Sequence, residues 1–292
     1  MERTFAGLPE LLVATYAQEG WARFLGIELN QREPLQRLRL AYDTRLLNAD
    51  GGVIHGGILA TLLLDAARIE TAAGWDTQAD LRSIRPLDGQ IVYLRPVHEG
   101  DVIASAQLMR AGRTLAFIAS EVRDAQGQLV AQGQWVFAHA GGEALEAVPE
   151  APDLAQVWNG ETDTGRMGAL LEANMKKRLT GLSLRQMGPG RCVIEASDIP
   201  EMRDSSGALA AGAQLLACDN VGVFAGFGLN ARITRMSTAA LKLSFIATPQ
   251  DEPLIVVGRS LGKAGPLISN QSLVYGRHSG RLYAFGTVTL AT

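Results

Sequence analysis

Two features of the sequence place reactive groups where they could do chemistry. The first is Asp65, which interrupts the otherwise apolar run ILATLLLDAA. A carboxylate in an apolar helix is costly to bury unless it has a partner or a use. The second is the pair Gly56 and Gly57 at the predicted start of the same helix, where backbone N–H groups lack intrahelical acceptors and carry partial positive charge. A base beside such donors is what attack of water on a carbonyl group requires.

The chain contains an internal repeat. Four blocks of its first half reappear in the second half, in the same order and at a nearly constant offset. They are residues 24–40, 58–67, 89–96 and 110–133, which parallel residues 178–194, 212–221, 240–247 and 263–286. This self-similarity indicates two copies of one domain, with Asp65 opposite Asp219. We expect domains at 1–140 and 165–292, joined by an acidic linker at 141–164 that is rich in Ala, Pro and Gly.

The elements expected in each copy define the fold class. Each copy begins with a short helix and a strand pair, continues with a long helix, and ends with antiparallel strands that include a hairpin. The expected helices are 8–18 and 57–73 in the first copy, and 165–177 and 208–225 in the second. The long helices are apolar nearly all round, which predicts that they are buried. One buried helix against an antiparallel sheet is an α+β arrangement.

Composition narrows the function classes. Among 292 residues, 27 Lys and Arg against 30 Asp and Glu give a net charge of −3, which argues against a nucleic-acid partner. Two cysteines imply no disulfide framework and favour a cytoplasmic chain. The most apolar stretch falls short of the roughly 20 residues of a membrane span. Four histidines without metal-binding spacing predict no metal and no cofactor.

The sequence resembles a known enzyme family. The segment NADGGVIHGGILATLLLDAA is similar to the PaaI-like branch of acyl-CoA thioesterases, which have the hotdog fold and show an Asn, a His-Gly-Gly and a later acid. The segment LLACDNVG resembles the second half of TesB-type double-hotdog thioesterases. The resemblance implies two tandem hotdog domains paired as a pseudo-dimer, and further assembly into a homo-oligomer. It also implies hydrolysis of an acyl-CoA to a carboxylic acid and free CoA, with CoA present only as part of the substrate.

The resemblance assigns roles to individual residues. Gly57, with Gly56, would form the oxyanion hole, and Asp65 would act either as general base or as nucleophile. Asn48 would hold water or the thioester, and His55 would orient the loop or contact the substrate. A hydroxyl residue from the partner copy is expected near the acid, which indicates Thr238 with Ser237 beside it. The composite site expected from these roles consists of Asn48, His55, Gly57, Asp65 and Thr238.

This sequence departs from the family pattern in three ways. The family's acid lies nine residues after the His, where this chain has Leu64, and Asp65 lies one residue later. The position that corresponds to Thr238 in the first copy is Pro86, so the two sites should be unequal. The second site would combine Asp219 with the run Leu209-Ala210-Ala211 in place of His-Gly-Gly, and the last strand lacks the Gln that a TesB-type site expects.

Plainer interpretations remain open for several of these residues. Asp65 could simply pair with Arg68, and Asn48 could be a turn residue. Three arginines are candidates for the CoA phosphates or ordinary surface residues; they are Arg95, Arg110 and Arg113. For the whole chain, the alternatives are a non-catalytic acyl-CoA-binding protein and a hotdog dehydratase or hydratase.

Overall fold

The computed structural model describes most of the chain. The described residues are 8–30, 37–48, 52–75, 80–139, 153–165, 168, 181–229, 236–249 and 251–292. The predicted short helix at 165–177 falls almost entirely outside these residues. The linker is described only from residue 153 onward, so the predicted domain limits at 140 and 165 stay a prediction.

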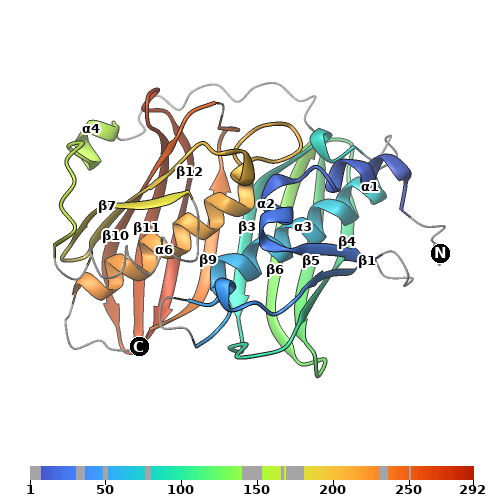
Figure 1. Cartoon of the computed structure of the whole chain (residues 1–292), viewed down its shortest axis with the longest axis horizontal. Coiled ribbons are helices and arrows are strands. Elements are labelled where there is room, and N and C mark those ends of the chain that lie inside the picture. Colours follow the sequence, from blue (N-terminus) through green and yellow to red (C-terminus); the bar gives the residue numbers. More distant parts are fainter. Residues whose placement is uncertain are drawn as a thin grey trace.

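The first half forms a sheet wrapped around one long helix (Figure 1). Its helices are α1 (Glu10–Tyr16), α2 (Gly20–Leu25) and α3 (Gly56–Gly74), with short 3-10 turns at Thr44–Leu46 and Leu81–Ser83. Its strands are β1 (Ile27–Asn30), β2 (Arg37–Leu40), β3 (Ile84–Tyr93), β4 (Val102–Ala111), β5 (Leu115–Asp124) and β6 (Leu129–His139).

The second half repeats this arrangement. Its helices are α4 (Leu154–Val157) and α6 (Ala211–Leu229), with a 3-10 turn at Pro200–Met202. Its strands are β7 (Leu182–Gly188), β8 (Arg191–Ala196), β9 (Ser237–Phe245), β10 (Leu254–Ala264), β11 (Leu267–Gly276) and β12 (Leu282–Ala291). The expected long helices are therefore present, although α6 begins and ends a few residues later than predicted.

The two halves share one antiparallel sheet of twelve strands. Its order is β1-β2-β4-β5-β6-β3-β9-β12-β11-β10-β8-β7, so β3 and β9 join the halves at the centre. In that pair Gln90 lies opposite Lys242. Both long helices lie on the same face of the sheet, and each begins near the centre of the molecule and runs outward (Figure 1). The predicted α+β fold of two tandem hotdog domains paired as a pseudo-dimer is confirmed.

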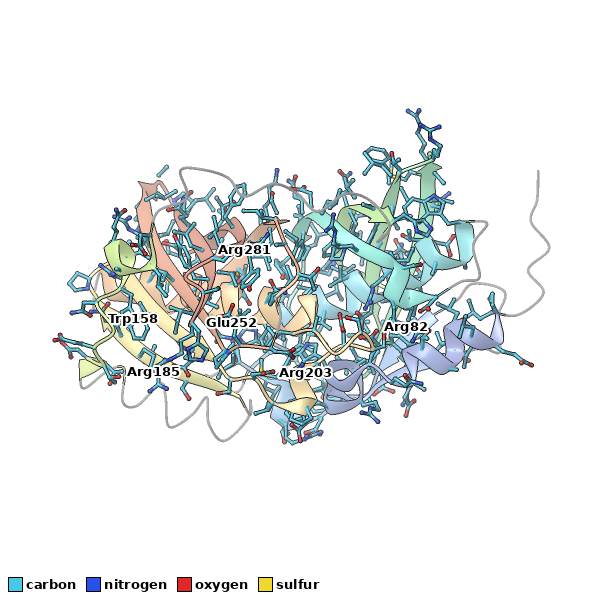
Figure 2. All side chains as sticks on the ribbon, turned by 90° about the horizontal axis from the view of Figure 1, so that it is seen from above. Arg82, Trp158, Arg185, Arg203, Glu252 and Arg281 are labelled. Atoms are coloured by element: carbon cyan, nitrogen blue, oxygen red, sulfur yellow. The ribbon has the colours of Figure 1, made fainter. Side chains whose placement is uncertain are left out.

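The helix α4 packs on the opposite face of the sheet. Its end residues Val157 and Trp158 join a small apolar cluster with side chains from β8, β10 and β11. The Arg277 guanidinium lies 5.8 Å from the centre of the Trp158 ring, a cation–π contact. Figure 2 shows Trp158 and Arg185 together at the end of the molecule that lies away from Arg82. Part of the predicted linker is therefore packed structure.

The starts of α3 and α6 cross closely, and glycine makes this possible. A Cβ atom on Gly57 would lie 2.5 Å from the Leu216 Cα, and a Cβ on Gly212 would lie 2.7 Å from the Thr61 side chain. The two contacts are equivalent, with the roles of the two helices exchanged. They make Gly57 equivalent to Gly212 and Thr61 equivalent to Leu216, which fixes how the two helices correspond.

Candidate active site

The carboxylate of Asp219 is the centre of a polar cluster where the two halves meet. Its Oδ2 accepts a hydrogen bond from the Gly57 N–H at 2.9 Å, and its Oδ1 accepts one from the Thr238 hydroxyl at 2.7 Å. The side chain is 1% exposed. Gly57 belongs to the first turn of α3, whereas Asp219 lies on α6 and Thr238 on β9. The cluster therefore exists only because the two halves are paired.

The ring of His55 connects this cluster to α6. Its Nδ1 accepts from the Gly57 N–H at 3.1 Å and lies 3.2 Å from the Asp219 Oδ2. Its Nε2 lies 3.2 Å from the Asn220 Oδ1, and the Asn220 amide nitrogen donates to the Leu216 carbonyl. Because the Asn220 oxygen can only accept, the proton of a neutral His55 lies on Nε2. His55 is thus the N-cap of α3 with its Nδ1 lone pair directed at the helix start.

A tyrosine hydroxyl fixes the first residue of α3, and the N–H group of that residue stays without an acceptor in the described part of the chain. The Tyr93 hydroxyl donates to the Gly56 carbonyl at 2.9 Å. Burial, and after it the charge of Asp219, raises the pKa of Tyr93 well above its ordinary value, so it remains a donor at neutral pH. The Gly56 N–H has no acceptor among the described residues. A Cβ on Gly56 would lie 2.9 Å from the Asp219 Oδ2, so a larger residue at this position would press on the carboxylate.

The thiol beside the acid is not a nucleophile. Cys218 is fully buried, and burial, followed by the charge of Asp219, raises its pKa far above the ordinary range. A thiol in that state is protonated at neutral pH and unreactive. The reactive groups of the cluster are therefore a carboxylate, a hydroxyl, an imidazole and backbone N–H donors.

The structure corrects the predicted grouping of acid and helix start. Asp65 does not join His55, Gly57 and Thr238, because Asp219 occupies that place. Asp65 instead accepts a hydrogen bond from the Tyr16 hydroxyl at 3.3 Å and lines a cavity with Arg68. The run Leu209-Ala210-Ala211, which was expected beside Asp219, lines the same cavity as Asp65.

The physical reason is the geometry of a helix. Asp65 lies eight residues beyond Gly57 on one helix, which at 1.5 Å per residue is about 12 Å along the axis. A side chain that far along cannot reach the first turn of its own helix. An acid can meet that turn only from a second helix, which α6 provides.

The correspondence of the repeats is also shifted by one residue. Both long helices have 19 residues, so Gly56 corresponds to Ala211, Leu64 to Asp219 and Asp65 to Asn220. The predicted alignment of Asp65 with Asp219 was therefore wrong within the helix. Asp219 lies nine residues after Ala210, the counterpart of His55, which is the spacing that the family pattern requires.

The remaining predicted residues lie elsewhere. The Asn48 side chain accepts from the Gly52 N–H at 3.2 Å, which agrees with its interpretation as a turn residue. Ser237 is exposed, next to Thr238 along an alternating strand. The three arginines proposed for CoA are also exposed, and Arg110 lines a groove with Phe117 and Gln134 on the strands of the first half. The structure therefore brings together His55, Gly56, Gly57 and Thr238 from the predicted set, around Asp219.

Three residues of the cluster were missed or undervalued from the sequence. Asp219 was placed in the weaker site, and neither Asn220 nor Tyr93 was proposed at all. The spacing of nine residues between Ala210 and Asp219 was a usable signal for the first. The other two carry no sequence signal, because the contact of Asn220 with His55 joins the two halves and the contact of Tyr93 with Gly56 joins a strand to the helix start 37 residues earlier.

Comparisons with known proteins agree with the fold and show a partial match to one protein family. Residues 47–138 match the model of the acyl-CoA thioesterase N-terminal domain. No curated protein matches the chain significantly. No helix among the described residues has the length and apolarity needed to cross a membrane.

Solved structures match nearly the whole chain. The tesB protein of Mycobacterium avium subsp. paratuberculosis has a TM-score of 0.61 at 15% identity, over 96% of this chain and 97% of that one. A putative thioesterase II from Thermobifida fusca has a TM-score of 0.61 at 15% identity, over 94% and 97%. The acyl-CoA thioesterase II TesB2 of Mycobacterium marinum gives 0.58 at 14% identity, over 91% and 95%. These matches confirm the predicted resemblance to tandem hotdog thioesterases, and at such identities the likeness of the structures concerns the fold.

Proposed function

We propose that this tandem hotdog protein is an acyl-CoA thioesterase and that Asp219, not Asp65, is its general base. The observation that carries the proposal is the triangle of Asp219, Thr238 and the Gly57 N–H at the start of α3. It puts a carboxylate, a hydroxyl and an anion-stabilising donor within hydrogen-bond distance of one another. The family match over residues 47–138 supports an acyl-CoA substrate.

The geometry supports attack by water. A carboxylate has about four acceptor positions, and Thr238 and Gly57 occupy two of them, so two remain with which Asp219 would accept from the attacking water. Asp219 would take a proton from this water while the water oxygen attacks the thioester carbonyl. The C–S bond then breaks, the carboxylic acid forms, and the CoA thiolate recovers the proton from Asp219. No redox or metal chemistry enters this sequence.

The Gly57 N–H would change partner during the reaction. At rest it donates to the negatively charged Asp219 Oδ2. When Asp219 becomes protonated it is a weaker acceptor, and the negative charge has moved to the carbonyl oxygen. The N–H group of Gly57, together with that of Gly56, can then stabilise this oxyanion with the help of the α3 dipole.

Release of free thiol tests the proposal. A thiol-reactive dye would follow turnover across short, medium, long and aryl acyl-CoAs, with steady turnover expected on at least one of them. Binding of acyl-CoA without turnover would instead support the non-catalytic binding protein. A single turnover in ¹⁸O-labelled water probes the role of the acid. A general base leaves Asp219 unlabelled, whereas ¹⁸O in the Asp219 carboxyl group would show that it had formed an anhydride that water opens at the aspartyl carbonyl.

A second function receives support from one contact. The His55 Nδ1 lies 3.2 Å from the Asp219 Oδ2, and a His–acid pair is what a hotdog hydratase needs. Both ring nitrogens are engaged, however, with Gly57 and Asn220, which leaves neither directed at a substrate. We therefore expect no loss of enoyl absorbance when the protein is mixed with enoyl-CoA. Such a loss, abolished by His55→Ala, would favour the hydratase instead.

A further inference from the structure

The side chain of Asn220 connects α6 to the ring of His55. Its amide nitrogen donates to the Leu216 carbonyl at 2.9 Å, and its Oδ1 lies 3.2 Å from the His55 Nε2. Because the Leu216 carbonyl can only accept, the amide cannot be turned over without losing this bond. Asn220 is also buried, so both contacts are shielded from solvent. It therefore presents a fixed acceptor to the ring.

The other ring nitrogen faces the carboxylate of Asp219. The His55 Nδ1 lies 3.2 Å from the Asp219 Oδ2, and both atoms accept from the Gly57 N–H. An Nδ1 without a proton shares this donor with the carboxylate. An Nδ1 with a proton would instead donate to Asp219 and could no longer accept from Gly57. The position of the His55 proton therefore determines which donors the Asp219 carboxylate faces.

The helices and strands around the ring contribute one charged contact. Among the described residues, Asp219 is the charged group in contact with His55. Burial raises the pKa of Tyr93 on β3 and of Cys218 on α6, so both groups stay protonated and uncharged at neutral pH. Lys242 on β9 and Asp88 on β3 pair with each other at 3.7 Å and are partly exposed.

The segment before α3 holds its charged groups near the surface. Arg45 is paired with Asp43 at 2.7 Å, and the His98 Nδ1 lies 2.7 Å from the Gly52 carbonyl in an exposed position. Asp50 lies outside the described residues. Asp219 and Asn220 are therefore the groups whose contacts set the state of the His55 ring.

The position equivalent to Asn220 on α3 carries a carboxylate, Asp65. An Asp side chain has nearly the same shape as an Asn side chain but accepts at both of its oxygens. A carboxylate beside the His55 Nε2 would favour the charged imidazolium, as an opposite charge does for any titratable group. The imidazolium carries a proton on Nδ1 as well, which would be donated to Asp219. The amide at position 220 accepts from Nε2 without adding this charge.

We infer that Asn220 is a positioning residue for the reaction at Asp219: it holds His55 with its proton on Nε2 and leaves Asp219 available as the base. Uptake of a second proton places it between the His55 Nδ1 and the Asp219 Oδ2, which stops turnover in acid. Histidine is the side chain that ordinarily changes charge between about pH 5 and 8. The inference rests on the function proposed above, but the position of the ring proton can be measured without turnover.

NMR of protein with ¹⁵N-labelled histidine rings tests the position of the proton. The chain has four histidines, and His55→Gln identifies the His55 signals by their loss. At pH 8 the wild type should show a proton on Nε2 and none on Nδ1. Asn220→Leu keeps the size of the side chain and removes the acceptor, so it should move the proton toward Nδ1, where Asp219 accepts it. Asp65→Leu, the matched change on α3, should leave the His55 signals unaltered.

Two results of this experiment would overturn the inference. One is a proton on Nδ1 in the wild type, and the other is an unchanged His55 ring in Asn220→Leu. The NMR measurement decides the inference even if the wild type releases no thiol, a result that would refute the proposed function alone.

The pH dependence of thiol release tests the consequence for turnover. Asn220→Leu should lower kcat at least about 10-fold, since a misplaced ring proton disables a catalytic base. Asn220→Asp retains the acceptor and should recover turnover at alkaline pH. The acid limb of its kcat/KM profile should lie about one pH unit or more above that of the wild type. A merely structural role would lower turnover or stability in both variants without moving this limb, and that result would overturn the inference.

Discussion

The two junctions between the halves of this chain occupy equivalent positions, but one holds polar groups where the other holds apolar ones. At the first, the start of α3 supplies His55 and two glycines, and the second half supplies Asp219 and Thr238. At the other, the start of α6 supplies Leu209-Ala210-Ala211, and the first half supplies Leu64 and Pro86. Each half thus keeps one part of a site and lacks the other.

This difference shows that the junction, and not the single domain, is the unit that assembles the polar cluster. If each half carried a complete site, both helix starts and both acids would be present. Instead, every replaced group falls in the same junction, which leaves one junction intact. The first half provides the donors and the second half provides the acid and hydroxyl, so neither half could form the cluster alone.

Replacing each of the two acids by its amide should give the largest contrast between the junctions. Asp219→Asn removes the carboxylate that, among the described residues, accepts from the α3 start, and should lower kcat by about 10²–10⁴-fold, the usual contribution of a general base. Asp65→Asn should change kcat less than about 3-fold, because Asp65 contacts Tyr16 and not the helix start. Steady-state kinetics of both variants on one acyl-CoA, with folding checked by circular dichroism, provide the measurement. Strong loss in Asp65→Asn with activity retained in Asp219→Asn would reverse the assignment of the two sites.

Exchanging the helix-start residues should give a smaller effect. Gly56→Ala installs the residue that α6 has at the same position, Ala211. Its Cβ would lie 2.9 Å from the Asp219 Oδ2, so the carboxylate must shift and the bond to the Gly57 N–H must weaken. We expect kcat to fall about 10–100-fold, in the range of losing part of an oxyanion hole.

The reciprocal change is the control for that experiment. Ala211→Gly alters the start of α6 at the cavity beside Asp65 and should leave kcat unchanged, at a cost of up to about 1 kcal/mol in helix stability. Urea unfolding measures that cost separately from activity. Unaltered kcat in Gly56→Ala would show that the space before Asp219 is not used by the substrate.

Much of this comparison could be predicted from the sequence, and the part that could not has a physical cause. The repeat predicted two equivalent domains, and the apolar helices predicted which elements are buried. The inequality of Thr238 and Pro86 predicted that the two sites differ. What failed was the choice of acid, because Asp65 and the His-Gly-Gly run are close in sequence and therefore appeared to belong together.

Local sequence is a poor guide to this site for a simple reason. A helix separates residues along its axis, so neighbours in a motif can belong to opposite junctions. The contact of Asn220 with His55 arises only after α3 and α6 have packed, and that of Tyr93 with Gly56 only after β3 has packed on α3. The hydrophobic pattern specifies that packing, but a one-residue shift between the repeats was enough to hide which acid it brings to the helix start.

The last expected effect concerns stability and distinguishes the junctions by pH. The pKa of Asp65 rises from 3.8 to about 7 in the folded protein, chiefly through burial. Between these values the folded state binds more protons than the unfolded state, so stability falls as pH rises from about 4 to 7 and then levels off. At about 1.4 kcal/mol per pKa unit, the decrease from this group is roughly 4 kcal/mol at most.

Replacing this carboxyl by a neutral amide should remove that pH dependence. Asp65→Asn keeps an acceptor for the Tyr16 hydroxyl and removes a buried charge, so we expect it to be more stable than the wild type by about 1–3 kcal/mol at pH 8. Below about pH 4 the wild-type group is neutral in both the folded and the unfolded state, and the two proteins should unfold at nearly the same urea concentration. A loss of stability at pH 8 would mean that the electrostatic attraction of the Arg68 charge outweighs the cost of burial. The charge of Asp65 would then be a structural requirement of its junction.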